Sequence, residues 1–248
     1  MPTTLPDPID YLDHAAREGR GYKLRLLDAL DLRPEDTALD LGCGPGTDLP
    51  AMAERAGSVI GVDLDPVMVA EARRRTEGLP VEVLLGDAHA LPLDPGSVSR
   101  VRVDRVLHLV RDPAAVLAEV ARVLRPGGRA VLAQPDWETL VLDPGAVSAN
   151  LAFNRFVCDR VVRHPVVGRR LARLASGAGL RVESVGTTAP VLRDFDTADH
   201  LLGLTRNAHR AAAAGHLTRA AADAWLADLA AGPFLAAFTL FRVVVTAP

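Results

Sequence analysis

Three glycines at alternate positions, Gly42, Gly44 and Gly46, follow Asp40 and a short apolar run. Glycine weakens the interior of a strand or helix, so such a cluster indicates a turn with unusual dihedrals or a ligand that approaches the backbone closely. The spacing is G-x-G-x-G, whereas dinucleotide-binding dehydrogenases use G-x-G-x-x-G. Glycine spacing alone is a weak signal. The residues around the turn must therefore show whether it binds a dinucleotide or another ligand.

Two further carboxylates follow at the ends of the next apolar runs. Asp63 lies about twenty residues beyond the turn, where a carboxylate can accept two hydrogen bonds from a ribose diol. Asp87, followed by Ala88, can accept a hydrogen bond from the exocyclic amine of an adenine. Each aspartate could instead cap a turn. The three acidic positions in order predict a site for a ligand that contains adenosine.

The elements that must position these residues alternate between strand and helix. Short apolar runs predict strands, and helical spacing with an N-terminal Asp-Pro at Asp65 and Asp112 predicts helices between them. This order is typical of a doubly wound parallel sheet, whose strands all end at one edge. The predicted strands are 37–42, 58–63, 81–87, 98–103 and 129–134, and the predicted helices are 47–57, 65–78 and 112–128.

The alternation ends after residue 136, and the remaining segments read as additions to one domain. We expect residues 1–34 to form a helical cap and residues 35–136 to form the ligand-binding core. We expect helical lid insertions at 137–178 and 191–232. The segments 180–187 and 236–246 are predicted as the final strands, in a single domain that spans 1–248.

Composition narrows the class of protein. The chain has 248 residues, 49% of them hydrophobic, and a net charge of −3 without a long basic block. This charge disfavours a nucleic-acid partner. Two cysteines, Cys43 and Cys158, and no His/Cys cluster predict no metal site. The polar N-terminus and the lack of a long apolar stretch lead us to expect a cytoplasmic protein without a membrane partner. The oligomeric state is not readable from the sequence.

Four stretches occur in order over residues 35–136, namely "LDLGCGPGTD", "VIGVDLDPVMVAEAR", "LLGDAHALPL" and "EVARVLRPGGRAVL". Together they resemble the class I S-adenosylmethionine-dependent methyltransferases. Within that family the likeness is to the small-molecule branch, of the methyltransferase type 11 or ubiquinone–menaquinone-biosynthesis kind. The resemblance implies an α/β, Rossmann-like seven-stranded sheet whose last strand is antiparallel, with helical cap segments at both ends.

The resemblance also implies S-adenosylmethionine as cofactor, with S-adenosylhomocysteine as product, and assigns roles to matching positions. The first turn would hold the methionine part, the acid after the second strand the ribose, and the acid after the third strand the adenine amine. The positions carried over are Asp40, Gly42, Cys43 and Gly44 for the methionine part, Asp63 and Leu64 for the ribose, and Asp87 and Ala88 for the adenine.

The end of the fourth strand departs from the family pattern. His108 is kept, but Leu109 stands where a second polar residue is common. Asp104 and Arg105 lie at the strand end that faces the cofactor. They could contact the methionine part or the acceptor, or they could pair with each other.

Methyl transfer is an in-line displacement for which the protein aligns the acceptor and excludes water. A hydroxyl or neutral amine acceptor must also lose a proton, and His108 is the best-placed general base, unless it only packs the next helix. Trp137 could stack an aromatic acceptor or be a core residue. Further candidates are Arg105, Phe153 and Arg206 for the acceptor, and Tyr11, which could lie over the cofactor or pack between helices.

The absence of two motifs narrows the class of acceptor molecule. No Asn-Pro-Pro-Tyr follows the fourth strand, and no Pro-Cys nucleophile occurs, which argues against nucleic-acid bases and glutamine side chains. The predicted function is methyl transfer to an O, N or C atom of a small-molecule metabolite. The alternative is an enzyme of the same fold and cofactor that catalyses a cyclisation, decarboxylation or similar reaction. A non-catalytic binding protein and a nicotinamide oxidoreductase are weaker alternatives.

Overall fold

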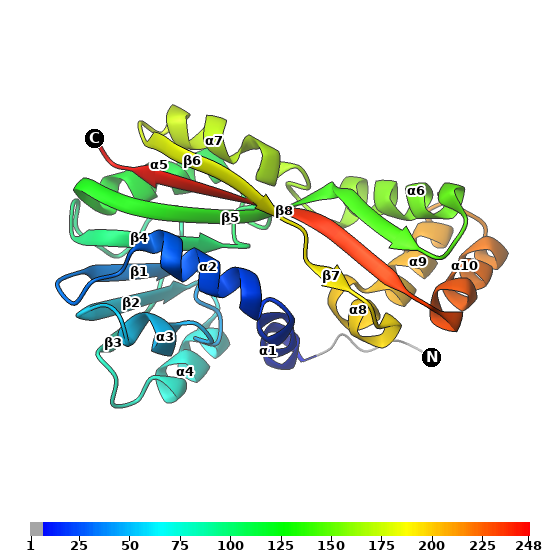
Figure 1. The fold of residues 1–248 in the computed structure, drawn as a ribbon, viewed down its shortest axis with the longest axis horizontal. Helices are drawn as coiled ribbons and strands as arrows, with labels where there is room; N and C mark the ends of the chain where they lie inside the picture. Colours follow the sequence, from blue (N-terminus) through cyan, green and yellow to red (C-terminus); the bar gives the residue numbers. More distant parts are fainter. Residues whose placement is uncertain (1–6) are drawn as a thin grey trace.

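The structure is a computed structural model that describes residues 7–248, and one large mixed sheet organises it (Figure 1). The strand order is β3-β2-β1-β4-β5-β8-β6. The strands from β3 to β5 are parallel, as the alternation of strand and helix predicts. Their bounds are Thr37–Leu41 for β1, Ser58–Asp63 for β2, Val81–Leu85 for β3, Val98–Asp104 for β4 and Leu124–Asp143 for β5.

The last strand runs in the opposite direction beside β5. β8 (Leu235–Thr246) lies between β5 and β6 (Arg181–Thr188) and is antiparallel to both. The expected sheet with an antiparallel last strand is therefore confirmed. A two-residue strand, β7 (Val191–Leu192), pairs with the start of β8 and was not expected.

Helices cover both faces of the core sheet. Leu39 and Leu41 on β1 point to the face that α5 and α7 cover, while Ala38 points to the face under α2, α3 and α4. This alternation follows from the two-residue period of a strand. The bounds of these helices are Arg20–Leu30 for α2, Leu49–Ala53 for α3, Pro66–Arg75 for α4, Pro113–Val123 for α5 and Val167–Gly177 for α7.

Two of these helices begin as the Asp-Pro pairs predict. The side chain of Asp65 accepts a hydrogen bond from the backbone N–H of Val67 at 2.8 Å, and Asp112 accepts one from Ala114 at 2.9 Å. Each bond satisfies a backbone donor that the first turn of a helix leaves free. Both caps lie at the sheet edge where the parallel strands end, so they also shape the loops there.

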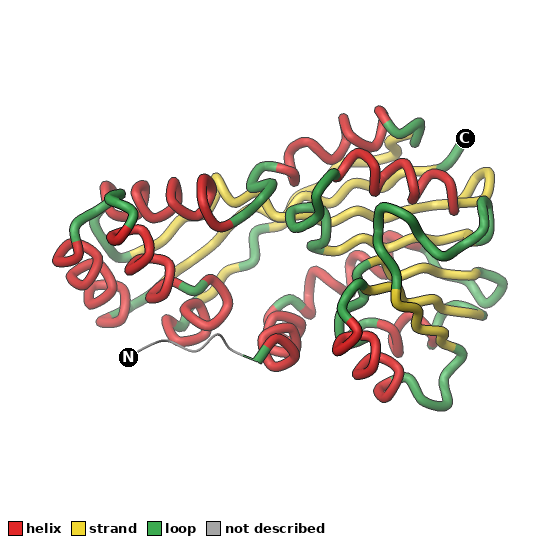
Figure 2. Tube along the Cα trace, turned by 180° about the vertical axis from the view of Figure 1, so that it is seen from behind, coloured by secondary structure: helices red, strands yellow, loops and turns green. Residues whose placement is uncertain are grey.

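A second lobe, the lid, is built on an extension of the same sheet. β5 and β8 continue past the core as a paired ribbon, with Leu142 opposite Ala236, and helices pack around it (Figures 1 and 2). Phe153 and Trp225 lie at the centre of the lid's own apolar core. The lid helices are α6 (Val147–Phe156), a π-helical turn (Val157–Val161), α8 (Phe195–Leu202), α9 (Leu204–Ala213) and α10 (Arg219–Ala231).

The lid differs from the expected helical insertions in two ways. Residues 137–143 extend β5 and are not helical. α7 packs on the core sheet and not in the lid, because Val167, Leu171 and Ala175 form a stripe that joins the core cluster. The helical period shows which face of α7 is apolar but does not say which surface will cover it.

The N-terminal cap also divides into two helices. α1 (Pro8–Glu18) ends at Gly19, contacts α8 of the lid and is followed directly by α2 on the core. Residues 1–6 of the expected cap lie outside the described residues. No helix in the part of the chain from residue 7 onward has the length and apolarity needed to cross a bilayer.

The core packing generates a stability prediction. Leu132 on β5 is fully buried, whereas Leu151 on α6 is 66% exposed. We expect Leu132→Ala to lower the free energy of unfolding by about 2–5 kcal/mol, because it leaves a cavity among packed strands. Leu151→Ala is the matched control and should change it by no more than about 0.5 kcal/mol. Chemical denaturation monitored by circular dichroism measures both, and equal effects would contradict the assigned burial.

Candidate cofactor and acceptor site

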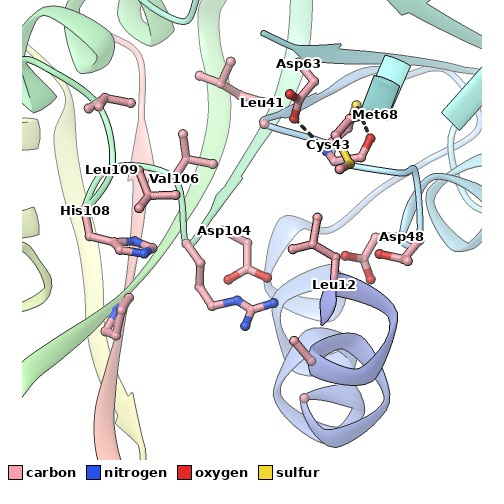
Figure 3. A pocket seen from close by; sticks show the side chains of 18 of the residues that line it. Leu12, Leu41, Cys43, Asp48, Asp63, Met68, Asp104, Val106, His108 and Leu109 are labelled. Atoms are coloured by element: carbon pink, nitrogen blue, oxygen red, sulfur yellow. Dashed lines mark hydrogen bonds between the residues drawn. The ribbon is translucent and has the colours of Figure 1, made fainter. Parts of the chain in front are cut away.

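A cavity of about 790 Å³ lies where the parallel strands end, between the core, α1 and the lid. Its size falls in the range of pockets that take small molecules and cofactors. Figure 3 shows Asp63 and Cys43 on one side of it and His108 with Leu109 on the other. The cavity therefore has a side near β1 and β2 and a side beyond β4.

The glycine turn after β1 forms part of the cavity wall. Gly42 has φ +73°, and a Cβ there would lie 2.3 Å from Cγ2 of Val106, so another residue would clash as well as strain the backbone. Gly44, with φ +55°, donates its backbone N–H to Oδ2 of Asp63 at 2.8 Å. The turn and the end of β2 are thereby joined at the cavity.

Asp63 is anchored by backbone donors on both of its carboxylate oxygens. Besides the bond from Gly44, Oδ1 accepts one from the N–H of Asp65 at 3.0 Å. Each carboxylate oxygen can accept a second hydrogen bond, so two acceptor positions are left for a diol. The neighbouring Leu64 is 68% exposed and also lines the cavity.

His89 holds the second ligand-facing acid, Asp87. Oδ1 of Asp87 accepts from the backbone N–H of His89 at 2.9 Å and lies 2.6 Å from its Nδ1. Nε2 of His89 accepts from the N–H of Asp112 at 3.2 Å, so Nδ1 carries the proton. Bonds from the backbone and side chain of His89 lower the pKa of Asp87. Sequence analysis assigned no role to His89, although its position two residues after Asp87 was a usable signal.

Asp40 lies beneath the cavity and is not among the residues that line it. It is almost fully buried, and Oδ1 accepts a hydrogen bond from Nη1 of Arg102 at 2.8 Å. Burial raises the pKa of Asp40, against the opposing effect of Arg102. Asp40, predicted to bind the cofactor, thus lies outside the lining of the cavity, and its partner in the described structure is Arg102. A charged residue inside the predicted strand 98–103 was the signal for this pair.

Arg102 joins three carboxylates under the cavity. Its Nη2 lies 2.8 Å from Oδ2 of Asp48 and 2.7 Å from Oδ2 of Asp104. Lys23 of α2 binds Asp48 and lies 3.7 Å from Asp104. Burial alone would raise the pKa of Asp48, but Arg102 and Lys23 lower it to about 2. The opposite charges of this cluster lie within ion-pair distance of one another, which offsets part of the cost of burying them.

Asp104 and Arg105 both line the cavity, and no hydrogen bond or ion pair joins their side chains in the described structure. Asp104 instead accepts from Arg102 and from the hydroxyl of Tyr22, at 3.3 Å. The guanidinium of Arg105 lies over the Tyr22 ring, 6.0 Å from its centroid. Arg105 also has φ +57°, a conformation that arginine rarely adopts.

His108 lies on the far side of the cavity with a defined tautomer. Oε1 of Gln134 is 3.3 Å from the backbone N–H of His108 and 3.2 Å from its Nδ1. Because a backbone N–H only donates, the glutamine atom is an oxygen, so Nδ1 carries the proton and Nε2 keeps its lone pair. Burial lowers the pKa of His108 to about 4, so the ring is neutral near pH 7.

Trp137 follows on β5, beside His108. Its ring stacks on Phe238 at a centroid distance of 5.1 Å and lies 6.5 Å from the His108 ring. Tyr11 of α1 also lines the cavity, and its hydroxyl donates to the carbonyl of Leu201 in the lid at 3.4 Å. Aromatic side chains from the core and from α1 thus border the same space.

The structure does not bring every predicted residue to the cavity. Phe153 packs against Trp225 inside the lid, at a centroid distance of 5.0 Å. Arg206 lies on α9 and is not among the described residues that border the cavity. These two residues, predicted to contact the acceptor, thus lie outside the lining of the cavity. The predicted residues that do line the cavity are Tyr11, Gly42, Cys43, Gly44, Asp63, Leu64, Asp87, Ala88, Asp104, Arg105, His108 and Trp137.

Comparison with known sequences agrees with this arrangement. The methyltransferase domain family matches residues 39–132. An uncharacterised 37.1 kDa protein of transposon TN4556 from Streptomyces fradiae is 52% identical over 99% of this chain and 73% of its own length. A demethylmenaquinone methyltransferase from Beutenbergia cavernae is 39% identical over 48% of this chain and 50% of its own length. The chain thus spans about half of that named relative.

Solved structures share the fold at low sequence identity. A protein from Bacillus halodurans C-125 superposes with a TM-score of 0.69 at 17% identity, covering 92% of this chain and 99% of its own. A geranyl diphosphate C-methyltransferase from Streptomyces coelicolor A3(2), solved with S-adenosylhomocysteine, gives 0.61 at 18%, covering 100% and 90%. The [4+2]-cyclase SpnF gives 0.59 at 18%, covering 92% and 80%.

The sheet order, the glycine turn and the two strand-end acids define an enzyme that binds an adenosyl cofactor at the edge of a Rossmann-like sheet. Residues 39–132 of the chain form a methyltransferase domain, and the fold is shared with solved methyltransferases. The cofactor that the motifs of this domain imply is S-adenosylmethionine.

The residues present fit this cofactor. Gly42 and Gly44 line the cavity with backbone atoms, and a Cβ at Gly44 would meet only Leu12, at 3.4 Å. Asp63 offers its spare lone pairs to a diol, and Asp87 is an ionised acceptor next to it in the sheet order. These are the groups that a ribose and an adenine amine require.

The anchoring of Asp63 generates a binding prediction. Asp63→Asn keeps an oxygen for Gly44 but removes the charge offered to the ribose, so affinity for S-adenosylhomocysteine should fall roughly ten- to a hundredfold. Isothermal titration calorimetry measures the change. Asp228→Asn, at an exposed site on α10, is the matched control and should bind like the parent. Unchanged affinity in Asp63→Asn would remove Asp63 from the binding site.

Proposed function

We propose that this enzyme transfers the methyl group of S-adenosylmethionine to an O, N or C atom of a small-molecule metabolite. One observation carries the proposal: a single cavity runs from Asp63 and Asp87 to His108 and Trp137. The first pair suits the cofactor, and the second pair leaves room for an acceptor beside it. The cavity lies between the core and the lid, which favours a ligand small enough to be enclosed.

Each cavity residue then takes a role on the cofactor side. Cys43 and the backbone of the glycine turn hold the methionine part, with Asp104 beside it. Asp63 and Leu64 hold the ribose, and Asp87 with Ala88 holds the adenine. Tyr11 closes over the cofactor from α1, since its hydroxyl bond to Leu201 fixes it between the core and the lid.

The bound cofactor supplies an activated methyl group. The protein aligns the acceptor and excludes water, which α1 and the lid do by covering the cavity. Nε2 of His108 accepts the proton of a hydroxyl or amine acceptor, and Gln134 holds the ring in the tautomer that allows it. Trp137 provides an aromatic surface against which the acceptor lies.

The first experiment measures product mass. The enzyme is incubated with S-adenosylmethionine and a panel of phenols, enols, amines and their acids, and both products are followed by mass spectrometry. We expect an acceptor that gains one CH₂ equivalent while S-adenosylhomocysteine forms in equal amount. A product of unchanged mass or with CO₂ lost, without S-adenosylhomocysteine, would contradict methyl transfer. That outcome would support the alternative, a cyclisation, decarboxylation or similar reaction. A [4+2]-cyclase shares this fold.

The tautomer and pKa of His108 generate a second prediction. With a hydroxyl or amine acceptor, His108→Gln should lower turnover by roughly 10²–10⁴-fold and leave S-adenosylhomocysteine affinity unchanged, because an amide cannot accept the proton. A base works when deprotonated, so parent activity should be full above its pKa and fall as the pH drops through about 4.

Initial rates against pH test this assignment, with His209→Gln in the lid as the matched control. In His108→Gln the acid limb should disappear along with most of the turnover. Parent-like rates in that variant would reduce His108 to a packing residue.

The cytoplasmic location stays a prediction from the sequence.

A further inference from the structure

Two hydrogen-bond donors on the acceptor side of the cavity lack a protein acceptor. Nε of Arg105 and Nε1 of Trp137 are buried without a hydrogen-bond partner among residues 7–248, and both residues line the cavity. Buried polar groups in native proteins are almost always paired with protein, water or ligand. Two unpaired donors at the border of one cavity therefore point to a ligand that brings the acceptors.

The charge of Arg105 is also unbalanced in the described structure. Burial lowers the pKa of its guanidinium, but Tyr22 and Asp104 raise it more, so the group stays cationic. Asp104 already accepts hydrogen bonds from Arg102 and from the Tyr22 hydroxyl, and it lies near Lys23. No ion pair within 4 Å is formed by Arg105 in this part of the chain. A buried cation without a counter-ion is costly, so the site favours an anion.

The backbone holds this cation at the cavity. Arg105 has φ +57° directly after β4, and its N–H donates to the carbonyl of Ala133 on β5 at 2.8 Å. Residues in this sparsely populated conformation cluster at functional sites, where the surrounding structure imposes it. Here the neighbouring strand imposes it, and the side chain lies over Tyr22 at the cavity wall.

The strand order separates this pair from the adenosine end of the cavity. Asp87 and Asp63 follow β3 and β2, whereas Arg105 follows β4 and Trp137 belongs to β5. Asp63 and His108 lie on opposite sides of the cavity in Figure 3. Trp137, whose ring lies 6.5 Å from that of His108, is on the acceptor side, and Arg105 follows β4, the strand between β1 and β5, at the same cavity.

We propose that Arg105 and Trp137 form an anion site that selects acceptors carrying a carboxylate on an apolar body. This inference deepens the proposed function and rests on it for the identity of the ligand as an acceptor. A guanidinium presents a planar fork that matches a carboxylate, and the indole N–H adds a third donor. The apolar body would lie against the neighbouring walls, formed by Leu109, Pro135, Leu192, Phe238 and Leu240.

The binding role follows from geometry and differs from catalysis. Arg105 and Trp137 hold the carboxylate, and the rest of the acceptor extends toward His108, whose ring is 6.5 Å from that of Trp137. A neutral acceptor of the same shape would leave both donors unpaired and would bind more weakly. The pair therefore determines which acceptors are held in position.

The test uses matched acids and amides on the protein loaded with S-adenosylhomocysteine. The pairs are benzoate and benzamide, 2-naphthoate and 2-naphthamide, and octanoate and octanamide, each titrated by calorimetry. We expect at least one acid to bind at least about tenfold more tightly than its amide. Arg105→Gln should abolish this preference, and Trp137→Phe, which keeps the ring but loses the N–H, should reduce it.

Controls separate charge loss and misfolding from the proposed contact. Arg170→Gln removes an exposed arginine on α7 and should keep the preference in full. Arg105→Lys keeps the positive charge but not the planar fork of the guanidinium, and it should keep part of the preference for acids over amides. Thermal unfolding of each variant shows whether the fold is intact.

Three outcomes overturn the proposal. The first is a parent that prefers no acid in any pair, and the second is a preference that survives in Arg105→Gln. The third is an Arg105→Gln variant that loses S-adenosylhomocysteine affinity, which would mean that the anion is the cofactor's own carboxylate. Failure of the proposed function looks different: acids bind through Arg105, but no acid or other acceptor gains a methyl group.

Discussion

The buried guanidinium of Arg102 is the interaction on which the floor of the cavity depends. It binds Asp40 on β1, Asp48 at the start of α3 and Asp104 at the end of β4, and Lys23 of α2 completes the cluster. Arg102 of β4 thus joins β1 and the start of α3 directly, and α2 joins the cluster through the contacts of Lys23 with Asp48 and Asp104. Removing one partner from such a buried pair costs about 3–5 kcal/mol, because a charge is left without compensation.

The cluster also explains how the two sides of the cavity come to lie together. It holds β1, which carries the glycine turn, against β4, which carries Asp104 into the cavity wall. The turn is then bonded to Asp63 through the N–H of Gly44. Arg105, next in the chain after Asp104, is placed on the other side by its backbone bond to β5. Cofactor and acceptor positions are therefore set by one connected set of contacts.

The lid is built on the same strands as the core. β5 and β8 pair over Arg129–Asp136 within the core and again over Val141–Asp143, as the ribbon that carries the lid helices. Family similarity is concentrated in residues 39–132, which hold the cofactor side. Trp137 and Phe238, which line the proposed acceptor side, lie outside that range.

Local pattern in the sequence was enough to predict the sheet, its parallel core and the edge at which Asp63, Asp87 and the glycine turn line one cavity. The reason is physical: parallel strands end at one edge, so Asp63 and Asp87, at consecutive strand ends, had to meet the glycine turn. The Asp-Pro helix starts were equally readable, because an N-cap acts on donors two or three residues away.

Contacts between distant elements were decided only by the tertiary structure. The sequence shows that Asp40 is acidic, but it does not say that Arg102 pairs with it. It also shows that α7 has an apolar face, but it does not say that this face packs on the core sheet. For the same reason Phe153 was misplaced, since an aromatic residue on a helix packs equally well in a lid core or against a ligand. The unpaired donors of Arg105 and Trp137 could not be foreseen either, because a donor lacks a partner only once every neighbour is in place.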